Sequence, residues 1–335
     1  MTDAALAQLS DRLFLATVLL YALAMLAFAG EQAARRSSRV AEATAAGLSV
    51  RQAAAARTRA MAGGATATLE APPQLPAADV PRASRAGAAG MAMTVLGLAV
   101  HLGSVVTRGM AADRTPWGNM YEFSSMVALM AVAIFVVLVA TGRVDRSLGA
   151  FVMVPAVLYL GLAGTVLYTA AGPLVPALDS YWIKIHVFAA ILSSGAFLLS
   201  GVVALLYLLR VRHDDLVAAG GTPRFPFSLG ASLPAARALD RVTYAVIAFA
   251  FPVWTFAIIA GAIWAEAAWG RYWGWDPKET WSFITWVLYA GYLHARATAG
   301  WKGTKAAWIS VAAAVALVID YYVVNIFVVG LHSYA

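Results

Sequence analysis

The segment from Trp264 to Arg296 concentrates side chains that could hold a flat aromatic ligand. It reads WAEAAWGRYWGWDPKETWSFITWVLYAGYLHAR and supplies six of the chain's 11 tryptophans, namely Trp264, Trp269, Trp273, Trp275, Trp281 and Trp286. An interfacial aromatic belt would explain tryptophan at a membrane edge, but it would not explain this density. Gly270 and Gly274 remove side chains between large rings, so a flat ligand or another backbone could approach closely.

The string Asp276-Pro277-Lys278-Glu279 predicts the start of a helix. Aspartate is a favoured N-cap, proline suits the first helical position, and glutamate at the third position completes a capping box. The capping role is compatible with a functional role, because a cap fixes the direction of the aromatic loop that precedes it.

Imidazole groups are the other candidate ligands in this chain. There are five histidines, at positions 101, 186, 213, 294 and 332. Imidazole commonly serves as an axial ligand of haem iron, although a single histidine on an apolar helix is more often a packing residue with a hydrogen bond. The chain has no cysteine. This excludes disulfides, iron–sulfur clusters and thiol nucleophiles, so any thiol chemistry must belong to a partner.

The composition indicates an integral membrane protein. The chain of 335 residues is 61% hydrophobic and 12% charged, whereas soluble domains carry about 25% charged residues. Continuous apolar runs begin near residues 13, 88, 123, 151, 183, 242, 282 and 306. Such runs predict an all-α polytopic protein with about eight transmembrane helices and exclude a barrel of short alternating strands.

The distribution of Lys and Arg predicts the orientation of the chain. The segments 31–86, 142–148, 210–241 and 296–305 carry 18 of the 24 basic residues, and the opposite side carries six. The positive-inside rule places the first set in the cytoplasm, so both termini face outward. His186, His332 and the loop 264–281 then lie on the same outer face. The net charge of +7 lies in loops, which argues against nucleic-acid binding.

Three regions follow from these patterns. Residues 1–30 are expected to form the first transmembrane helix. Residues 31–86 are rich in Ala and Arg and then in Gly and Pro, which predicts a poorly ordered cytoplasmic linker. Residues 87–335 are expected to form a transmembrane bundle that carries the tryptophan-rich loop at 264–281.

The string WGRYWGWDPKETW resembles the tryptophan-rich "WWD" signature of haem-handling proteins in cytochrome c maturation. The flanking strings YAGYLHAR and VNIFVVGLHSY resemble the System II branch of that family, the ResC/CcsA-type membrane subunit. The resemblance is most specific over residues 181–335, is weaker over TPWGNMYEFSSM, and does not extend to 31–86.

The resemblance implies a function. Such proteins carry haem b to the outer face of the cell (plasma or inner) membrane and keep its iron ferrous. With a ResB-type partner they act as a cytochrome c synthase, or haem lyase, and bring the haem vinyl groups beside the Cys-x-x-Cys-His thiols of apocytochrome c. Haem b is then a substrate, and the partners are the ResB-type subunit, apocytochrome c and membrane lipid.

The resemblance also implies site residues. His186 and His332 match the outer pair of axial ligands, and His294 matches a histidine of a second haem site within the membrane. His294 lies 13 positions after Trp281, which is ~20 Å along a helix. Its second axial ligand could be His101, which lies nearer the outer end, or a residue of a partner.

The remaining expectations concern the haem platform and its charges. The platform residues are expected to be Trp269, Gly270, Trp273, Gly274, Trp275 and Asp276. Arg271 and Lys278 are the cations that could pair with the haem propionates, or they could be ordinary interfacial anchors. Asp320 is expected to form an interhelical hydrogen bond to Asn325 or to a tyrosine.

Other function classes account for fewer of these residues. A b-type electron-transfer cytochrome would need two histidines but no glycine-spaced tryptophan loop, and it would retain its haem through turnover. A solute transporter would be expected to show inverted repeats and broken helices, and neither is evident. A purely structural scaffold would leave the histidines unexplained.

Overall fold

The computed structural model describes residues 2–62, 80–173, 180–298, 300–301 and 303–332. Within these residues the chain is helical and has no strand. The long helices are α1 (Asp3–Ala62), α2 (Val80–Ala112), α3 (Met120–Ala140), α4 (Gly149–Thr165), α5 (Tyr181–Ala218), α6 (Ala236–Trp269), α7 (Pro277–Thr298) and α8 (Thr304–Val318). Short turns of helix are η1 (Arg146–Leu148), η3 (Phe227–Ser232), the π-helix η4 (Ile319–Val323) and α9 (Val324–Phe327).

The prediction of an all-α polytopic membrane protein is confirmed. Seven of the described helical segments are long and apolar enough to cross a membrane. The eighth expected span is α7, whose 22 residues would extend ~33 Å. Its mean hydropathy is lowered by charged residues at both ends, Lys278 and Glu279 in its first turn and Arg296 in its last.

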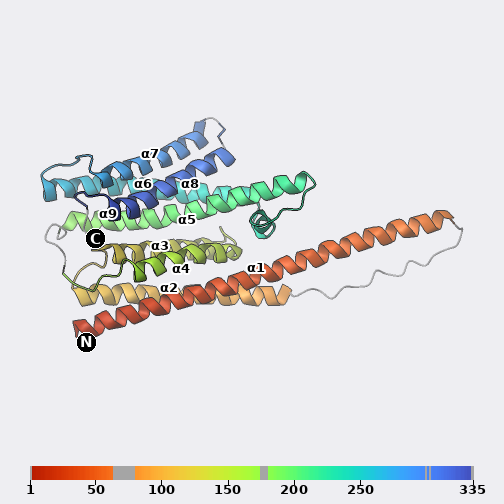
Figure 1. The fold of residues 1–335 in the computed structure, drawn as a ribbon, viewed down its shortest axis with the longest axis horizontal. Coiled ribbons are helices and arrows are strands. Elements are labelled where there is room, and N and C mark those ends of the chain that lie inside the picture. Colours follow the sequence, from red (N-terminus) through yellow and green to blue (C-terminus); the bar gives the residue numbers. More distant parts are fainter. Residues whose placement is uncertain (1, 63–79, 174–179, 299, 302, 333–335) are drawn as a thin grey trace.

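Successive long helices run in opposite directions (Figure 1). Helices α1, α3, α5 and α7 therefore begin at one end of the bundle, which we call the motif end because the tryptophan-rich α6–α7 connection lies there. Helix α9 also ends there. The pair α1 and α2 forms one side of the bundle, α3 and α4 follow, and α6, α7 and α8 lie beyond α5 on the other side.

Helix α1 is longer than expected. Instead of ending near residue 30, it continues as one helix to Ala62, and α2 already begins at Val80. The expected linker 31–86 is therefore helical over 31–62 and 80–86, while 63–79 lie outside the described residues. The physical reason is the abundance of Ala, Arg, Gln and Glu over 31–62, because these residues have high intrinsic helix propensity.

Small residues allow α5 to occupy the centre of the bundle. A Cβ at Gly195 would lie 2.9 Å from the backbone nitrogen of Ala131 in α3, and a Cβ at Gly201 would lie 2.7 Å from Cβ of Ala314 in α8. Close approach of this kind is how membrane helices gain packing contacts without a hydrophobic driving force between them. The middle of α5 is thereby held between α3 and α8.

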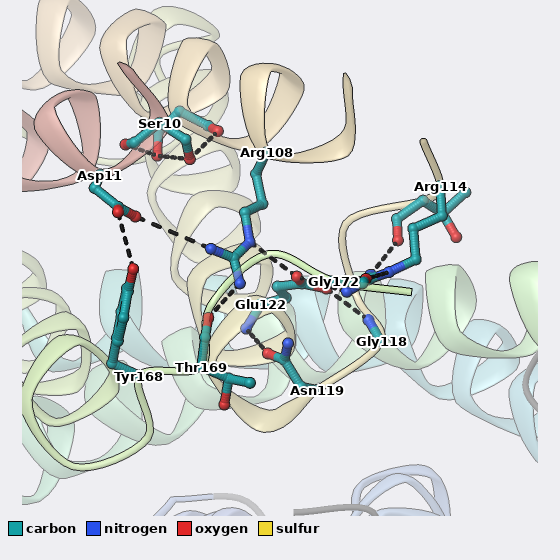
Figure 2. A network of polar contacts seen from close by, with 12 residues as sticks. Ser10, Asp11, Arg108, Arg114, Gly118, Asn119, Glu122, Tyr168, Thr169 and Gly172 are labelled. Atoms are coloured by element: carbon teal, nitrogen blue, oxygen red, sulfur yellow. Dashed lines mark hydrogen bonds and ion pairs between the residues drawn. The ribbon is translucent and has the colours of Figure 1, made fainter. Parts of the chain in front are cut away.

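A buried carboxylate organises the loop between α2 and α3 (Figure 2). Glu122, at the start of α3, accepts hydrogen bonds from Arg108 Nε at 2.9 Å, from Arg114 Nη1 at 2.7 Å and Nη2 at 3.0 Å, and from the Gly118 backbone at 2.8 Å. Asn119 caps α3 by accepting from the Glu122 backbone. These contacts fix the loop 113–119 on top of α3.

The same arginines extend the network to neighbouring segments. Arg108 donates to the carbonyl of Thr169, and Arg114 Nε donates to the carbonyl of Gly172 at 2.8 Å. Asp11 of α1 lies 4.0 Å from Arg108 Nη1 and accepts a hydrogen bond from Tyr168. The cluster therefore ties α1, the α2–α3 loop and the segment after α4 together at the motif end.

The arrangement of the helices gives a test of orientation. Reporter fusions placed after residue 335 and within 31–86 should report opposite sides of the membrane, with the second in the cytoplasm, because 18 of 24 basic residues lie on that side. The measurement is the activity of paired reporters that are active on only one side. Two fusions reporting the same side would contradict the helix count.

Removal of the Glu122 carboxylate should destabilise the protein. Glu122→Ala would leave Arg108, which is 3% exposed, with the neutral Thr169 carbonyl and with Asp11 at 4.0 Å as its remaining partners, and breaking a buried pair in this way costs about 3–5 kcal/mol. Thermal unfolding in detergent measures the effect. Glu266→Ala, at an exposed position of α6, is the matched control and should change stability by under about 0.5 kcal/mol. Equal stabilities would contradict the role of Glu122.

Candidate functional site

A cavity of about 220 Å³ lies at the motif end of the bundle. Its wall is formed by the loop 115–119, by the starts of α3, α5 and α7, by the end of α6, and by η4 and the segment after α9. These elements are far apart in the sequence. Of the residues expected to form the site, His186, His332, Trp269, Trp273 and Lys278 line this cavity.

His186 is held in one orientation by α6. Its Nδ1 lies 2.7 Å from the carbonyl oxygen of Ala257, and because a carbonyl only accepts, Nδ1 must carry the proton. The Nε2 lone pair is then available to a metal. Gly261 lies one turn further along α6, and a Cβ there would lie 2.7 Å from the His186 ring. The absence of a side chain at 261 therefore leaves room for the imidazole.

His332 is held by the aspartate of the tryptophan-rich motif. Its Nδ1 donates to Oδ1 of Asp276 at 2.9 Å, while the backbone nitrogen of Leu331 donates to Oδ2 at 2.7 Å. A Cβ at Gly330 would lie 2.8 Å from that same Oδ2, so glycine permits the close approach. Asp276 thus anchors the segment after α9 to the start of α7.

The charge state of this pair follows from burial and hydrogen bonding. Burial lowers the pKa of the His332 imidazole, and this outweighs the opposing effect of Asp276. Burial raises the pKa of the Asp276 carboxyl, but the hydrogen bonds from Leu331 and His332 outweigh burial and hold that pKa below its usual range. At neutral pH an ionised carboxylate therefore faces a neutral imidazole, whose Nε2 can act as a ligand.

Aromatic rings connect the two histidines. The indole of Trp264 is almost completely buried, lies parallel to the His186 ring with centroids 6.5 Å apart, and lies 6.0 Å from the His332 ring. Trp269 contacts both Trp264 at 4.7 Å and His332 at 4.8 Å. The two imidazoles therefore share one aromatic wall, although they come from α5 and from the end of the chain.

The motif loop is shaped by backbone requirements as much as by ring packing. Gly270 ends α6 in the left-handed conformation with φ +70° and has nothing within 4 Å of a Cβ position, so its role is a helix C-cap rather than space between rings. A Cβ at Gly274 would collide with the guanidinium of Arg271. Gly270 thus serves the path of the chain, whereas Gly274 leaves room for the Arg271 side chain.

Glu279 binds the backbone of the motif loop through its carboxylate. Its Oε2 accepts hydrogen bonds from the backbone nitrogens of Gly274 at 2.7 Å and Asp276 at 3.0 Å, and Arg271 Nη1 lies 3.4 Å from its Oε1. Asp276 Oδ1 accepts from the Lys278 backbone at 3.1 Å. The predicted capping box is therefore confirmed, and it closes the loop as well as starting α7.

The three tryptophans of the motif proper have different surroundings. Trp269 and Trp273 line the cavity. Trp275 is 65% exposed, has a positive φ of 56°, and contacts Trp273 edge to face at 5.7 Å. A bulky residue at positive φ is uncommon, and strained residues of this kind cluster at functional sites. Trp275 is not among the residues that line the cavity. Trp275 thus points away from the cavity, toward the protein surface.

The two expected cations point in different directions. Lys278 turns inward and donates to the carbonyl of Asp320 at 3.0 Å and to Asn325 Oδ1 at 3.2 Å. Its ammonium is also 4.0 Å from the Asp320 carboxylate. The interhelical partner of Asp320 is therefore Lys278, and the expectation of a bond to Asn325 or a tyrosine was wrong. Arg271 instead lies against Glu279 and the face of Trp269.

The membrane histidines are not brought together. His294 lies on an exposed face of α7 and does not line the cavity. His101 is fully buried between α1 and α3, where Tyr21 Oη lies 3.4 Å from Nδ1 and Ser125 Oγ 2.9 Å from Nε2. Both ring nitrogens of His101 are engaged, and α2 and α7 lie on opposite sides of the bundle (Figure 1). His101 is therefore not placed to complete a site with His294.

Some contributors to the site were not found from sequence. Gly261, which makes room for His186, and Glu122, which fixes the loop carrying Trp117, both act through contacts with distant segments. The one local signal for Glu122 was an acidic residue at the start of an apolar run, which marks a functional candidate in a membrane helix.

Comparison with known proteins gives the family. A family model described as "Cytochrome C assembly protein" matches residues 117–332. The "Cytochrome c biogenesis protein CcsA" of Gloeobacter violaceus is 34% identical over 277 residues, covering 69% of this chain and 82% of the relative. The CcsA of Microcystis aeruginosa is 33% identical over 298 residues, covering 76% and 89%. That of Guillardia theta is 35% identical over 240 residues, covering 68% and 79%.

The matched range begins in the loop fixed by Glu122 and ends at His332, so it contains His186, His332 and all of the cavity lining except Thr115. The comparisons support a role in cytochrome c biogenesis for a multi-pass membrane protein. The expected resemblance to the System II branch is confirmed, and the chain belongs to the cytochrome c assembly protein family of CcsA type.

Proposed function

We propose that this protein binds haem b in the cavity at the motif end and presents it, on the outer face of the cell membrane, for covalent attachment to apocytochrome c. The observation that carries the proposal is the pairing of His186 and His332 along one aromatic wall. Each donates from Nδ1 to a fixed acceptor, so each presents an unprotonated Nε2. This is the state in which imidazole ligates haem iron.

The surroundings of the two histidines fit a haem. Large apolar pockets with a few placed polar groups are typical of cofactor sites. Trp264, Trp269 and Trp273 supply flat apolar surface, and Lys278 is the cation that lines the cavity. We infer that Lys278 faces a propionate, and that Arg271, held by Glu279 at the loop surface, serves mainly to shape the loop.

The attachment reaction adds a cysteine thiol across each haem vinyl group. The S–H bond breaks, a carbon–sulfur bond forms, and the proton goes to the neighbouring vinyl carbon, so no oxidant is consumed. Since this chain has no cysteine, both thiols come from the Cys-x-x-Cys-His segment of apocytochrome c. We propose that the chain acts with a ResB-type partner in a cytochrome c synthase, and that the exposed Trp275 belongs to the surface where the apocytochrome docks.

We further propose that His294 serves a separate haem site within the membrane. His294 is exposed on α7, so a second protein could contribute the other axial ligand. Both ring nitrogens of His101 are already engaged, which favours a residue of the partner over His101 in that role. Haem would pass from this site to the cavity before attachment.

Replacing either cavity histidine should reduce haem binding. Loss of an outer partner of a metal ligand costs about 10–100-fold in affinity, so His186→Gly and His332→Gly, which remove a ligand itself, should each cost at least that much. Added imidazole should partly restore binding, because it can occupy the vacated position. The measurement is the haem content and reduced absorption spectrum of each purified variant, with and without imidazole.

The matched control for this experiment is His213→Gly. His213 lies in the last part of α5, at the opposite end from the cavity, where its Nδ1 bonds to the Phe227 carbonyl. Haem content should be unchanged there and should not respond to imidazole. Wild-type haem content and spectra in both cavity variants would refute the assignment of His186 and His332 as ligands.

A His294→Ala variant should separate the two proposed haem sites. In cells, the cavity of this variant should be depleted of haem, because the path through the membrane site is lost. The purified apoprotein should nevertheless bind added haem in the cavity with wild-type affinity, since His294 does not line it. Pyridine haemochrome assay of the isolated protein and titration of the apoprotein provide the two measurements. Full haem occupancy in cells would indicate that His294 only packs.

A further inference from the structure

Asp276 is the acceptor for three donors that come from two distant parts of the chain. The backbone nitrogen of Lys278 and Nδ1 of His332 both donate to its Oδ1, and the backbone nitrogen of Leu331 donates to its Oδ2. Asp276 is 7% exposed. A helix N-cap needs only the first of these bonds, so the other two call for a separate explanation.

We propose that Asp276 is the positioning residue of His332, which it holds in the tautomer and orientation that present Nε2 to haem iron. The inference rests on the proposed function and deepens it. It means that the aspartate of the tryptophan-rich motif acts on the iron through a ligand that lies 56 positions further along the chain.

The chemistry favours an aspartate at this place. An ionised carboxylate only accepts hydrogen bonds, whereas an amide presents one acceptor oxygen and one donor nitrogen. In Asp276→Asn, the amide nitrogen must face either the Leu331 N–H or Nδ1 of His332. In the first arrangement the amide N–H faces the Leu331 N–H, and two donors cannot form a hydrogen bond with each other. The second turns His332 into an acceptor at Nδ1, which moves its proton to Nε2 and blocks ligation, as a neighbouring amide does to a catalytic histidine.

The two axial histidines are consequently unequal. His186 donates to a neutral backbone carbonyl, while His332 donates to an anion. A carboxylate partner raises the basicity of an imidazole ligand, and a more basic ligand stabilises ferric over ferrous iron. Asp276 should therefore lower the reduction potential of the bound haem, and this effect should act through His332 alone.

Asp276→Ser tests the proposal while keeping the helix cap. Serine is a good N-cap, but its side chain is too short to hold His332 and Leu331 at once. The variant should bind haem about 10–100-fold more weakly, and the bound haem should have a higher reduction potential. Haem titration of the apoprotein and spectroelectrochemistry measure these effects. Asp145→Ser, which replaces the N-cap of η1 at the opposite end, should change neither.

A double-variant cycle distinguishes positioning from general stability. If Asp276 acts through His332, then adding Asp276→Ser to His332→Gly should cause no further loss of haem affinity in the presence of imidazole. A further loss of the same size as in the single variant would overturn the proposal and leave Asp276 as a structural anchor. This comparison remains informative even if Asp276→Ser alone folds less well.

The outcomes also separate this inference from the proposed function. If His332→Gly lowers haem affinity but Asp276→Ser has wild-type affinity and potential, the positioning role is wrong and the haem site stands. If neither histidine variant changes haem binding, the proposed function itself fails.

Discussion

Polar groups that are buried at the motif end must find their hydrogen-bond partners within the protein, because burial removes them from water. Three buried carboxylates meet this constraint, and each fixes one segment that closes the cavity. Glu122 fixes the loop 113–119, Glu279 fixes the motif loop, and Asp276 fixes the segment after α9. Part of the cavity wall therefore consists of non-helical segments between the helices, and carboxylates hold these segments by accepting their hydrogen bonds. Without these carboxylates, no hydrogen bonds of this kind would fix the three segments relative to one another.

This construction suits the proposed haem site, which would have to hold haem firmly and yet expose one edge of it. The backbone of α5 carries His186 as part of the most buried span of the described chain, whereas His332 sits on a short segment that α7 holds through one side chain. We infer that the first ligand is fixed by the bundle and the second by a local contact. A b-type cytochrome that retains haem through turnover would gain nothing from this difference, while a protein that hands haem on needs one ligand to be separable.

Much of the fold could be predicted from sequence because it depends on local patterns. Apolar runs predicted a helical membrane protein, and the string from Asp276 to Glu279 predicted where α7 begins. The family could be predicted for the same reason, since WGRYWGWDPKETW is a contiguous string. The length of α1 was missed although its helix formers are local, because charge and the Gly/Pro-rich stretch that follows argued for a linker.

Sequence patterns alone thus pointed to the residues of the proposed haem site: His186, His332 and the tryptophans of the motif. Tertiary structure alone decided how they act together. The contact between Asp276 and His332 joins residues 56 apart, the room for His186 comes from Gly261 on another helix, and Lys278 turns inward to Asp320 rather than outward to the membrane surface. Periodicity reports which face of a helix is apolar. It does not report which donor and acceptor meet across helices, because that depends on how the helices pack.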